Sequence, residues 1–224
     1  MQRKTPLVEG EFFHIYNRGV EKRILFLDVH DYHRFMMLLY LCNSNQPVNI
    51  ENHFRKGRTF TDIFSVDRDT LLVDISAWCL MPNHFHFVLC ARQENGITSF
   101  LRKLCTGYST YFNQKYKRSG ALFQGKFKSE HLEYDEYLKY LFSYVHLNPV
   151  KLIPGEKNWK DIGIQNKGSV KKYIENYEYS SFPDYNGIHR IYNSIITKNT
   201  VLDIHTDFNE MIQNMFVWLD REKE

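Results

Sequence analysis

Two apolar, β-rich segments joined by a turn dipeptide constrain this chain more than any other feature. Leu71 to Met81 and His84 to Ala91 lie on either side of Pro82-Asn83. Two such segments around a short turn predict an antiparallel hairpin. The chain must therefore build a sheet around this hairpin, and its other segments must supply the neighbouring strands and the helices that cover them.

The remaining periodic segments predict two further strands and three helices. The strand segments are Glu11 to Tyr16 and Phe123 to Glu133. Apolar residues recur at helical spacing over Asp31 to Leu41, from Gly96 to Ser119-Gly120, and from Asp135 to Pro149. The order strand, helix, strand, strand, helix, strand, helix predicts an α+β, ferredoxin-like (RRM-like) antiparallel sheet with helices on one face. We expect the opposite face to remain open for a ligand.

The length and composition fit one main domain with an extension. The chain has 224 residues, of which 43% are hydrophobic and 25% are charged, as in an average globular protein. We expect a domain over residues 1–155 with an insertion at 43–69, and an extension over 156–224 that becomes helical at Val201 to Leu219. The longest apolar run, Phe35 to Cys42, is too short to cross a bilayer. We therefore expect a cytoplasmic protein with no membrane partner.

Positive charge is concentrated in one segment, although the net charge of the whole chain is only +3. No Asp or Glu occurs from Asn95 to Ser129, whereas seven cationic residues do: Arg102, Lys103, Lys115, Lys117, Arg118, Lys126 and Lys128. Aromatic residues interleave with them, and rings beside cations suit an unstacked single strand of nucleic acid. The same pattern also fits core rings beside a solvated cationic helix face, so composition leaves both interpretations open.

The segment Pro82-Asn83-His84-Phe85-His86 carries the sharpest chemical signal. Side chains alternate along a strand, so His84 and His86 project from one face while Phe85 points into the core. Two such imidazoles can converge on one divalent metal if a third ligand completes the site. Histidines on a half-exposed strand are also common as ordinary polar residues, and the pair alone does not decide between these interpretations.

A second chemical signal ends the last predicted helix of the domain. Tyr144 and Asn148 lie one turn apart and share a helix face. A tyrosine beside an oxygen ligand can serve as a nucleophile next to a metal. The structural alternative is a core tyrosine followed by an asparagine that ends the helix before proline. His146 faces roughly 200° away from Tyr144 on the same helix, so the group that takes the tyrosine proton is not identified.

Four motifs in a fixed order resemble a known family. They are Tyr16-Asn17-Arg18-Gly19, Met81-Pro82-Asn83-His84-Phe85-His86, Gly120-Ala121-Leu122-Phe123-Gln124-Gly125-Lys126-Phe127-Lys128 and Tyr144-Val145-His146-Leu147-Asn148-Pro149, with a weaker echo at Tyr179-Ser180-Ser181-Phe182. In this order they resemble the insertion-sequence-200-like, single-tyrosine HUH transposases, and among these the REP-associated tyrosine transposases. The resemblance covers about residues 10–155. Two segments depart from the family pattern, 43–69 and the acidic end of the chain.

The resemblance implies a role for each site residue. His84, His86 and Asn148 correspond to the ligands of Mg²⁺ or Mn²⁺, and Tyr144 corresponds to the nucleophile. It implies an HUH endonuclease fold and a DNA transposase that cleaves and rejoins single-stranded DNA at hairpin-flanked sites through a 5′-phosphotyrosine. It also implies a monomer or homodimer, associated with the nucleoid when bound to DNA. We expect Arg18 and the seven cations of the acid-free segment to contact the DNA.

Two other functions compete with this interpretation. One is a domesticated module that binds single-stranded DNA or RNA without cleaving it; loss of the tyrosine or of a histidine would indicate it, and both are intact. The other is a metal-dependent hydrolase in which water attacks and Tyr144 is structural. The hydrolase would leave no covalent product on the protein.

Overall fold

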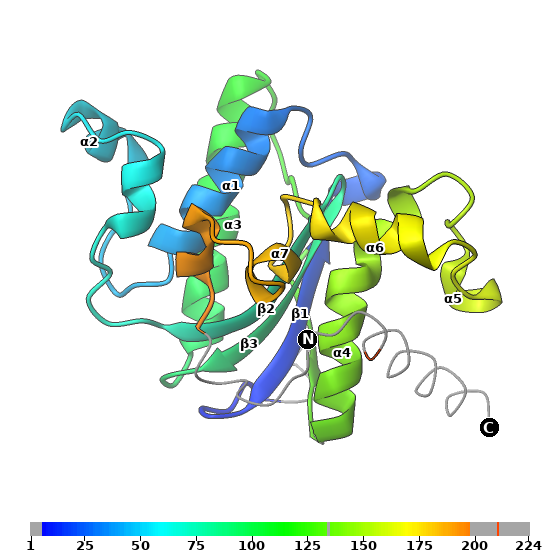
Figure 1. Ribbon diagram of the computed structural model, residues 1–224. Coiled ribbons are helices and arrows are strands. Elements are labelled where there is room, and N and C mark those ends of the chain that lie inside the picture. Colours follow the sequence, from blue (N-terminus) through cyan, green and yellow to red (C-terminus); the bar gives the residue numbers. More distant parts are fainter. Residues whose placement is uncertain (1–5, 134, 198–209, 211–224) are drawn as a thin grey trace.

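The computed structural model describes residues 6–133, 135–197 and 210. Its sheet has four strands, β1 (Phe12–Arg18), β2 (Val73–Met81), β3 (His84–Ala91) and β4 (Lys128–His131), in the order β2-β3-β1-β4. All neighbouring strands are antiparallel. This order, with β1 between β3 and β4, is the predicted ferredoxin-like arrangement, and the α+β fold class is confirmed (Figure 1).

The last strand is shorter than the sequence predicts. The predicted strand runs from Phe123 to Glu133, but β4 contains only Lys128–His131. Gly125 has a φ of +68°, which an extended strand does not adopt. The segment before β4 is therefore a loop, and it is tied to the end of β1 by a hydrogen bond of 2.8 Å from Gln124 N to Arg18 O.

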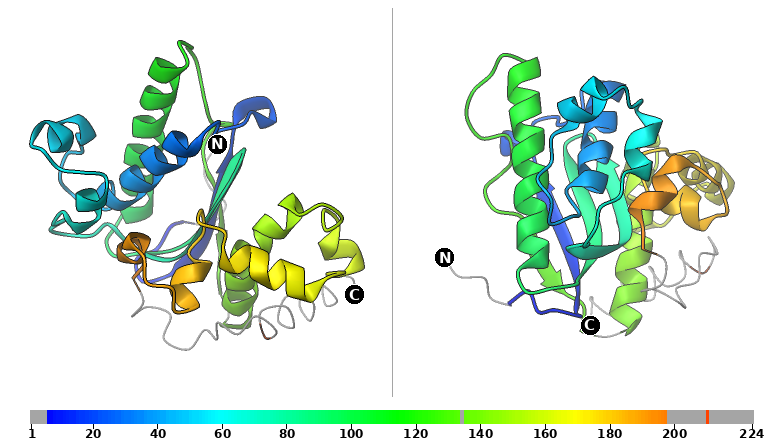
Figure 2. Two further views of the ribbon diagram at one scale, coloured as in Figure 1. Left: turned by 45° about the horizontal axis from the view of Figure 1, so that its top comes forward. Right: turned by 90° about the vertical axis from the view of Figure 1, so that its left-hand side faces the viewer.

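Helices α1 (Val29–Leu41) and α3 (Gly96–Lys115) cover one face of the sheet, as predicted (Figures 1 and 2). The core between them and the sheet includes Phe35, Phe100 and Trp78. α1 begins two residues before the predicted start because Asp28 and Asp31 form a capping box that satisfies its free backbone N–H groups.

The opposite face is partly covered, so less of it is open than the sequence suggests. α4 (Asp135–Leu147) packs against β2 and β3 and continues as a 3-10 turn, η3 (Asn148–Leu152). Beyond it come three more helices, α5 (Trp159–Ile162), α6 (Lys167–Glu175) and α7 (Phe182–Tyr185). Together these elements bury a second core that includes Val145, Trp159 and Phe182. Figure 2 shows α4 and α6 across the sheet from α1 and α3.

The predicted insertion contains two short elements. They are α2 (Ile50–Arg55) and the 3-10 turn η2 (Thr61–Ser65). η2 packs against a further 3-10 turn, η4 (Ile191–Ile195), through rings such as Phe64 and Tyr192. The 3-10 turn η1 (Val20–Lys22) follows β1. The predicted helix from Val201 to Leu219 lies outside the described residues, apart from residue 210.

The edge of the sheet at β2 is sealed by the C-terminal segment. Leu80 N donates to Tyr179 O at 2.8 Å, and Ser181 N donates to Trp78 O at 2.9 Å. Further along the same strand, Thr197 N donates to Ile75 O at 2.9 Å. The Tyr/Ser-rich segment therefore belongs to the packed body of the protein and satisfies the backbone groups of an edge strand.

Candidate active site

The two histidines of β3 project from the same face of the sheet, as the alternation predicts. Their ring centroids lie 5.0 Å apart. Phe85 and Phe87 point the other way and are fully buried beneath α1 and α3. The core residues of β3 therefore hold the histidine pair on the face that α4 covers.

Both histidines are held in the neutral form. Burial lowers the pKa of His84 to about 4, and the nearby positive charges of Lys151 and Arg18 add to this effect. Burial likewise places the pKa of His86 well below its ordinary value. Neutral imidazole is the form that binds metals, so the surroundings prepare both rings as ligands.

Each ring is oriented through its Nδ1 atom. His84 Nδ1 lies 2.6 Å from Asn83 Oδ1, and His86 Nδ1 lies 2.9 Å from His14 Nε2. The Nε2 atom of each ring is thereby left as the ligating atom. Metal-binding histidines commonly have this pattern, in which the second nitrogen is fixed by a neighbour.

Tyr144 on α4 lies next to His86, one member of the histidine pair. Its ring meets that of His86 edge to face, with centroids 5.4 Å apart and an interplanar angle of 86°. Burial is the main reason that the pKa of Tyr144 is raised above its ordinary value, against a hydrogen bond with the Asn148 side chain that lowers it. Lys160 Nζ lies 3.7 Å from the centroid of the tyrosine ring. The phenol is therefore protonated at neutral pH and has a cation beside it.

Asn148 begins the turn after α4 and is fully buried. Its Nδ2 donates to Tyr144 O at 3.0 Å, and its Oδ1 accepts from Lys151 Nζ at 3.4 Å. The hydrogen bond to the Tyr144 backbone fixes the orientation of the Asn148 amide. Its Oδ1, which is the atom able to bind a metal, therefore points toward Lys151. The sequence-predicted pairing of Tyr144 with Asn148 on one face is present in the structure.

The two imidazoles of His84 and His86 supply only nitrogen ligands. A site for Mg²⁺ or Mn²⁺ would also need an oxygen ligand, such as the amide oxygen of Asn148. Among residues 6–133, 135–197 and 210, no cluster of three or more His, Cys, Asp or Glu side chains is arranged to hold a metal ion. Two neutral imidazoles together with an amide oxygen such as that of Asn148 would make a mixed nitrogen and oxygen set of the kind Mn²⁺ accepts.

Two hollows meet at this site. A cavity of about 280 Å³ is lined by His86, Tyr144, Glu130 and Lys160, among others. A larger one of about 640 Å³ is lined by Arg18, Lys22, Asn83, His84, Gln124 and Lys128. Tyr16 borders both of them. His86 and Tyr144 therefore face the small hollow, and His84 faces a larger one with three cations on its walls.

The predicted DNA-contacting cations divide into two groups. Arg102, Lys117, Lys126 and Lys128, together with Arg18, have exposed side chains. The ammonium of Lys103 instead donates to the backbone oxygens of Ser44 and Gln46, and Arg118 donates to Asn113 and Ala121. The acid-free segment is thus not a uniform cationic surface.

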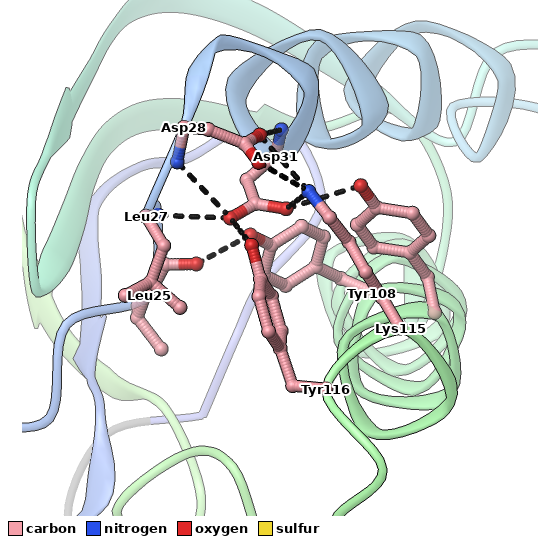
Figure 3. A network of polar contacts seen from close by, with 8 residues as sticks. Leu25, Leu27, Asp28, Asp31, Tyr108, Lys115 and Tyr116 are labelled. Atoms are coloured by element: carbon pink, nitrogen blue, oxygen red, sulfur yellow. Dashed lines mark hydrogen bonds and ion pairs between the residues drawn. The ribbon is translucent and has the colours of Figure 1, made fainter.

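Lys115 belongs to the second group and forms ion pairs across the protein. Its ammonium lies 2.8 Å from Asp28 and 2.7 Å from Asp31, both of which precede or begin α1. Tyr111 and Tyr116 also donate to Asp31, at 3.0 and 2.8 Å (Figure 3). The absence of acids within the segment therefore does not leave this cation unpaired, because its carboxylate partners come from another element.

Sequence reasoning missed His14, which touches His86, and Glu130, which touches His14. His14 on β1 lies between His86 and Glu130 of β4, with His14 Nδ1 3.3 Å from Glu130 Oε2. His14 and Tyr16 are two positions apart and share the site face of β1, and the sequence pattern shows this spacing. The partners of His14, however, depend on how three strands pair. His146 lies on the far side of α4, where its Nε2 is 2.8 Å from Ser181 Oγ, so it is remote from the Tyr144 hydroxyl as the helix geometry predicts.

An antiparallel sheet that carries a histidine pair, with a tyrosine on the helix that covers the same face, is the arrangement that the sequence resemblance predicts. The family described as "Transposase IS200 like" matches residues 47–148, just under half of the chain, and this range includes His84, His86, Tyr144 and Asn148. β1 and the C-terminal segment lie outside the matched range. This is the family that the sequence motifs resemble.

A solved structure shares the fold. It is the structure of a REP-associated tyrosine transposase bound to a REP hairpin, with 13% sequence identity and a TM-score of 0.53. The similarity covers 85% of this chain and 89% of the other. No curated protein sequence matches the chain. Within the part of the chain that the structure describes, no helix combines the length and apolar character needed to cross a membrane.

Proposed function

We propose that this transposase cleaves and rejoins single-stranded DNA, with Tyr144 as the nucleophile. The observation that carries the proposal is the position of Tyr144, edge to face on His86 with ring centroids 5.4 Å apart. Tyr144 also meets the ring of His14 edge to face, with centroids 5.9 Å apart, so it packs on two histidines of the sheet and borders the smaller hollow. His86 and Tyr144 come from two of the four motifs that carry the family resemblance.

In the proposed reaction, the Tyr144 oxygen attacks a phosphodiester phosphorus. The phenol gives up its proton as a bond forms between its oxygen and phosphorus, the bond from phosphorus to the 3′ oxygen breaks, and the released 3′ oxygen takes up a proton to become a hydroxyl. The 5′ phosphate stays on the tyrosine, and attack by a 3′ hydroxyl reverses the step and joins strands. The protein residues position the phenol, because α4 holds the partly buried Tyr144 ring against His86.

His84, His86 and Asn148 are the residues that would hold Mg²⁺ or Mn²⁺. A bound metal ion would neutralise charge on a phosphate oxygen. The contribution of the protein is to keep both rings neutral and to fix them through Nδ1, as Asn83 and His14 do. Lys160 beside the Tyr144 ring favours the phenolate that forms during attack.

The position of Tyr144 supports cleavage within one chain. The tyrosine lies next to the histidines of its own chain, so a second copy is not needed to complete the grouping. We therefore favour action by a monomer over exchange of helices in a homodimer. A chain that carries Tyr144→Phe, mixed with one that carries His86→Ala, should then fail to restore cleavage.

The DNA path we propose begins at the larger hollow. Arg18, Lys22 and Lys128 line it, and His84 opens into it. Because the REP-associated relative is bound to a REP hairpin, we propose a hairpin-flanked single strand as the substrate here too. Exposed Arg102 and Lys126 border a neighbouring groove beside α3 and extend the cationic surface.

The decisive experiment is incubation with end-labelled single-stranded hairpin DNA and Mn²⁺, followed by denaturing electrophoresis. A protein-linked DNA band that disappears in Tyr144→Phe supports the transposase reaction. Cleavage with no linked band would indicate the hydrolase, in which water attacks. Binding without any cleavage would indicate the domesticated binding module.

A further inference from the structure

A chain of three side chains runs from the surface of β4 to the histidine pair. Glu130 Oε2 lies 3.3 Å from His14 Nδ1, and His14 Nε2 lies 2.9 Å from His86 Nδ1. His14 is only 3% exposed, and its ring stacks on that of His86 with an interplanar angle of 9°. The contacts therefore connect a partly exposed carboxylate to a candidate metal ligand through one buried ring.

The strand pairing that builds this chain is specific. His14 lies directly opposite Glu130 in the β1–β4 ladder, and β1 pairs on its other side with β3, which carries His86. Glu130 is held in place by two hydroxyl donors, Tyr16 at 3.0 Å and Tyr137 at 3.5 Å. The carboxylate is thus fixed on β4 rather than free to rotate away from His14.

Donor and acceptor rules then fix the proton positions along the chain. An ionised carboxylate only accepts hydrogen bonds, so His14 must donate from Nδ1 to Glu130. A neutral His14 consequently has a bare Nε2, which must accept from Nδ1–H of His86. His86 then has no proton on Nε2, and that nitrogen carries the lone pair that a metal needs.

We propose that Glu130 and His14 are positioning residues that hold His86 in its metal-binding tautomer. The inference rests on the proposed function, because the His86 tautomer matters for the reaction only if His86 binds a metal. It goes further by adding two residues to the site, one of which, His14, lies outside the range matched by the family. Such supporting partners of metal-binding histidines commonly contribute roughly 10- to 100-fold to metal affinity.

A different set of proton positions along the Glu130–His14–His86 chain would place the His86 proton on Nε2, and the test distinguishes the two sets. A doubly protonated His14 would donate to both Glu130 and His86, and His86 would then carry its proton on Nε2 and lose the ligating lone pair. The two arrangements differ in the protonated nitrogen of His86. Long-range ¹H–¹⁵N NMR of the metal-free, ¹⁵N-labelled protein distinguishes them, and we expect the Nδ1–H form for His86.

Three variants extend the test to metal affinity, measured by titration calorimetry with Mn²⁺. His14→Phe keeps the buried ring but removes the acceptor, and we expect affinity to fall by roughly 10- to 100-fold. His14→Gln places an amide oxygen near the Nε2 position and should restore much of the affinity. Glu130→Gln, at a partly exposed site, should weaken binding in the same direction without unfolding the protein.

A matched control exists on the opposite face of β4. His131 of β4 lies 3.1 Å from Glu11, a histidine–carboxylate pair with no contact to His86 among the described residues. Glu11→Gln should leave Mn²⁺ affinity unchanged. A purely structural role for His14 would lower the melting temperature without the selective rescue by Gln.

Failure of the inference and failure of the proposed function give different results. If His84→Ala and His86→Ala both leave Mn²⁺ affinity unchanged, the metal site itself is wrong. If those variants abolish binding while folded His14→Phe and Glu130→Gln bind as the unaltered protein does, only the role of the positioning residues is overturned. An Nε2–H tautomer for His86 in the unaltered, metal-free protein would overturn it as well.

Discussion

The ammonium of Lys115 lies 2.7 Å from the carboxylate of Asp31, a side chain with no solvent exposure. The pair links the end of α3 to the first turn of α1, and Figure 3 shows Asp28, Tyr116 and the backbone around Leu27 converging on it. A cation from the acid-free segment thus stabilises the packing of the two helices that cover the sheet.

Replacing Lys115 with Met should therefore reduce stability rather than DNA affinity. The change leaves the Asp31 charge buried without its cation, which commonly costs about 3–5 kcal/mol. We expect the lower end of that range, because Leu27 N, Tyr111 and Tyr116 still donate to Asp31. Urea denaturation measures the free energy of unfolding directly.

The exposed Lys117 provides the control for this experiment. Lys117→Met removes the same charge two residues away and should change the free energy of unfolding by no more than about 0.5 kcal/mol. Equal losses in the two variants would show that the Lys115 pair contributes nothing specific.

Tyr144→Phe should abolish cleavage and the DNA-linked product while leaving the fold and DNA binding nearly intact. The variant removes one hydroxyl from a helix whose packing depends on buried residues such as Leu141 and Val145. Gel assays with labelled DNA and circular dichroism test the two parts separately.

Tyr140 is the matched control, because it lies on the same helix with its ring stacked 6.2 Å from that of Tyr144. Tyr140→Phe should retain both cleavage and the adduct. Peptide mass spectrometry that places the nucleotide on Tyr140, Tyr108 or Tyr111 would move the chemistry to another residue.

Replacing Lys126 and Lys128 with Ala should weaken binding to hairpin DNA and flatten its dependence on salt. Both side chains are exposed, and Lys128 lines the hollow that contains His84. Each phosphate contact on a single strand contributes a slope of roughly −0.7 in log affinity against log salt, so losing two should reduce the slope by about 1.4. Fluorescence anisotropy at several salt concentrations gives the slope.

The same titration with Lys103→Met gives the contrast, since that ammonium is bound to the backbone oxygens of Ser44 and Gln46. Its salt slope should match that of the unaltered protein. Unchanged affinity and slope in the Lys126 and Lys128 double variant would instead place the DNA elsewhere, along Arg18 and Lys22.

The metal-free protein should lose stability as the pH falls from about 6.5 toward about 4. Burial lowers the pKa of folded His84 to about 4 and that of His146 to about 3, whereas an unfolded histidine titrates at about 6.5. Between these values the unfolded state binds more protons, so the free energy of unfolding decreases with acid. Each loss of 1 kcal/mol lowers the melting temperature by roughly 2–4 °C.

His84→Gln isolates one of these contributions. The variant removes a titrating ring from the window, so its melting temperature should fall less between pH 7 and pH 5 than that of the unaltered protein. Parallel curves for the two proteins would show that His84 titrates normally in the folded state.

Local periodicity was enough to predict most of the fold and which candidate residues share a face. Alternation along β3 placed His84 and His86 on one face, and helical spacing placed Tyr144 with Asn148. Both signals depend only on residues a few positions apart. The shortened β4 escaped prediction because apolar residues such as Phe123 resemble strand residues, while the φ of +68° at Gly125 is invisible in composition.

Contacts between distant segments could not be predicted in this way. His14 and Glu130 meet because β1 pairs with both β3 and β4, and no local pattern encodes that register. The pairing of Lys115 with Asp28 and Asp31 joins residues more than 80 positions apart. Charge counted along the sequence therefore overstated the cations available to DNA.

The hydrogen bonds from Trp78 and Leu80 to the segment around Ser180 give the far end of the chain a protective role. Without residues 179–181, β2 would present free backbone N–H and C=O groups at a sheet edge, ready to accept a strand from another molecule. A chain cut after residue 155 should consequently form strand-exchanged oligomers or aggregates, visible by size-exclusion chromatography, even though Tyr144 and the candidate metal ligands are still present. Shortening the protein to its motifs would therefore expose a sheet edge before it removed the candidate nucleophile.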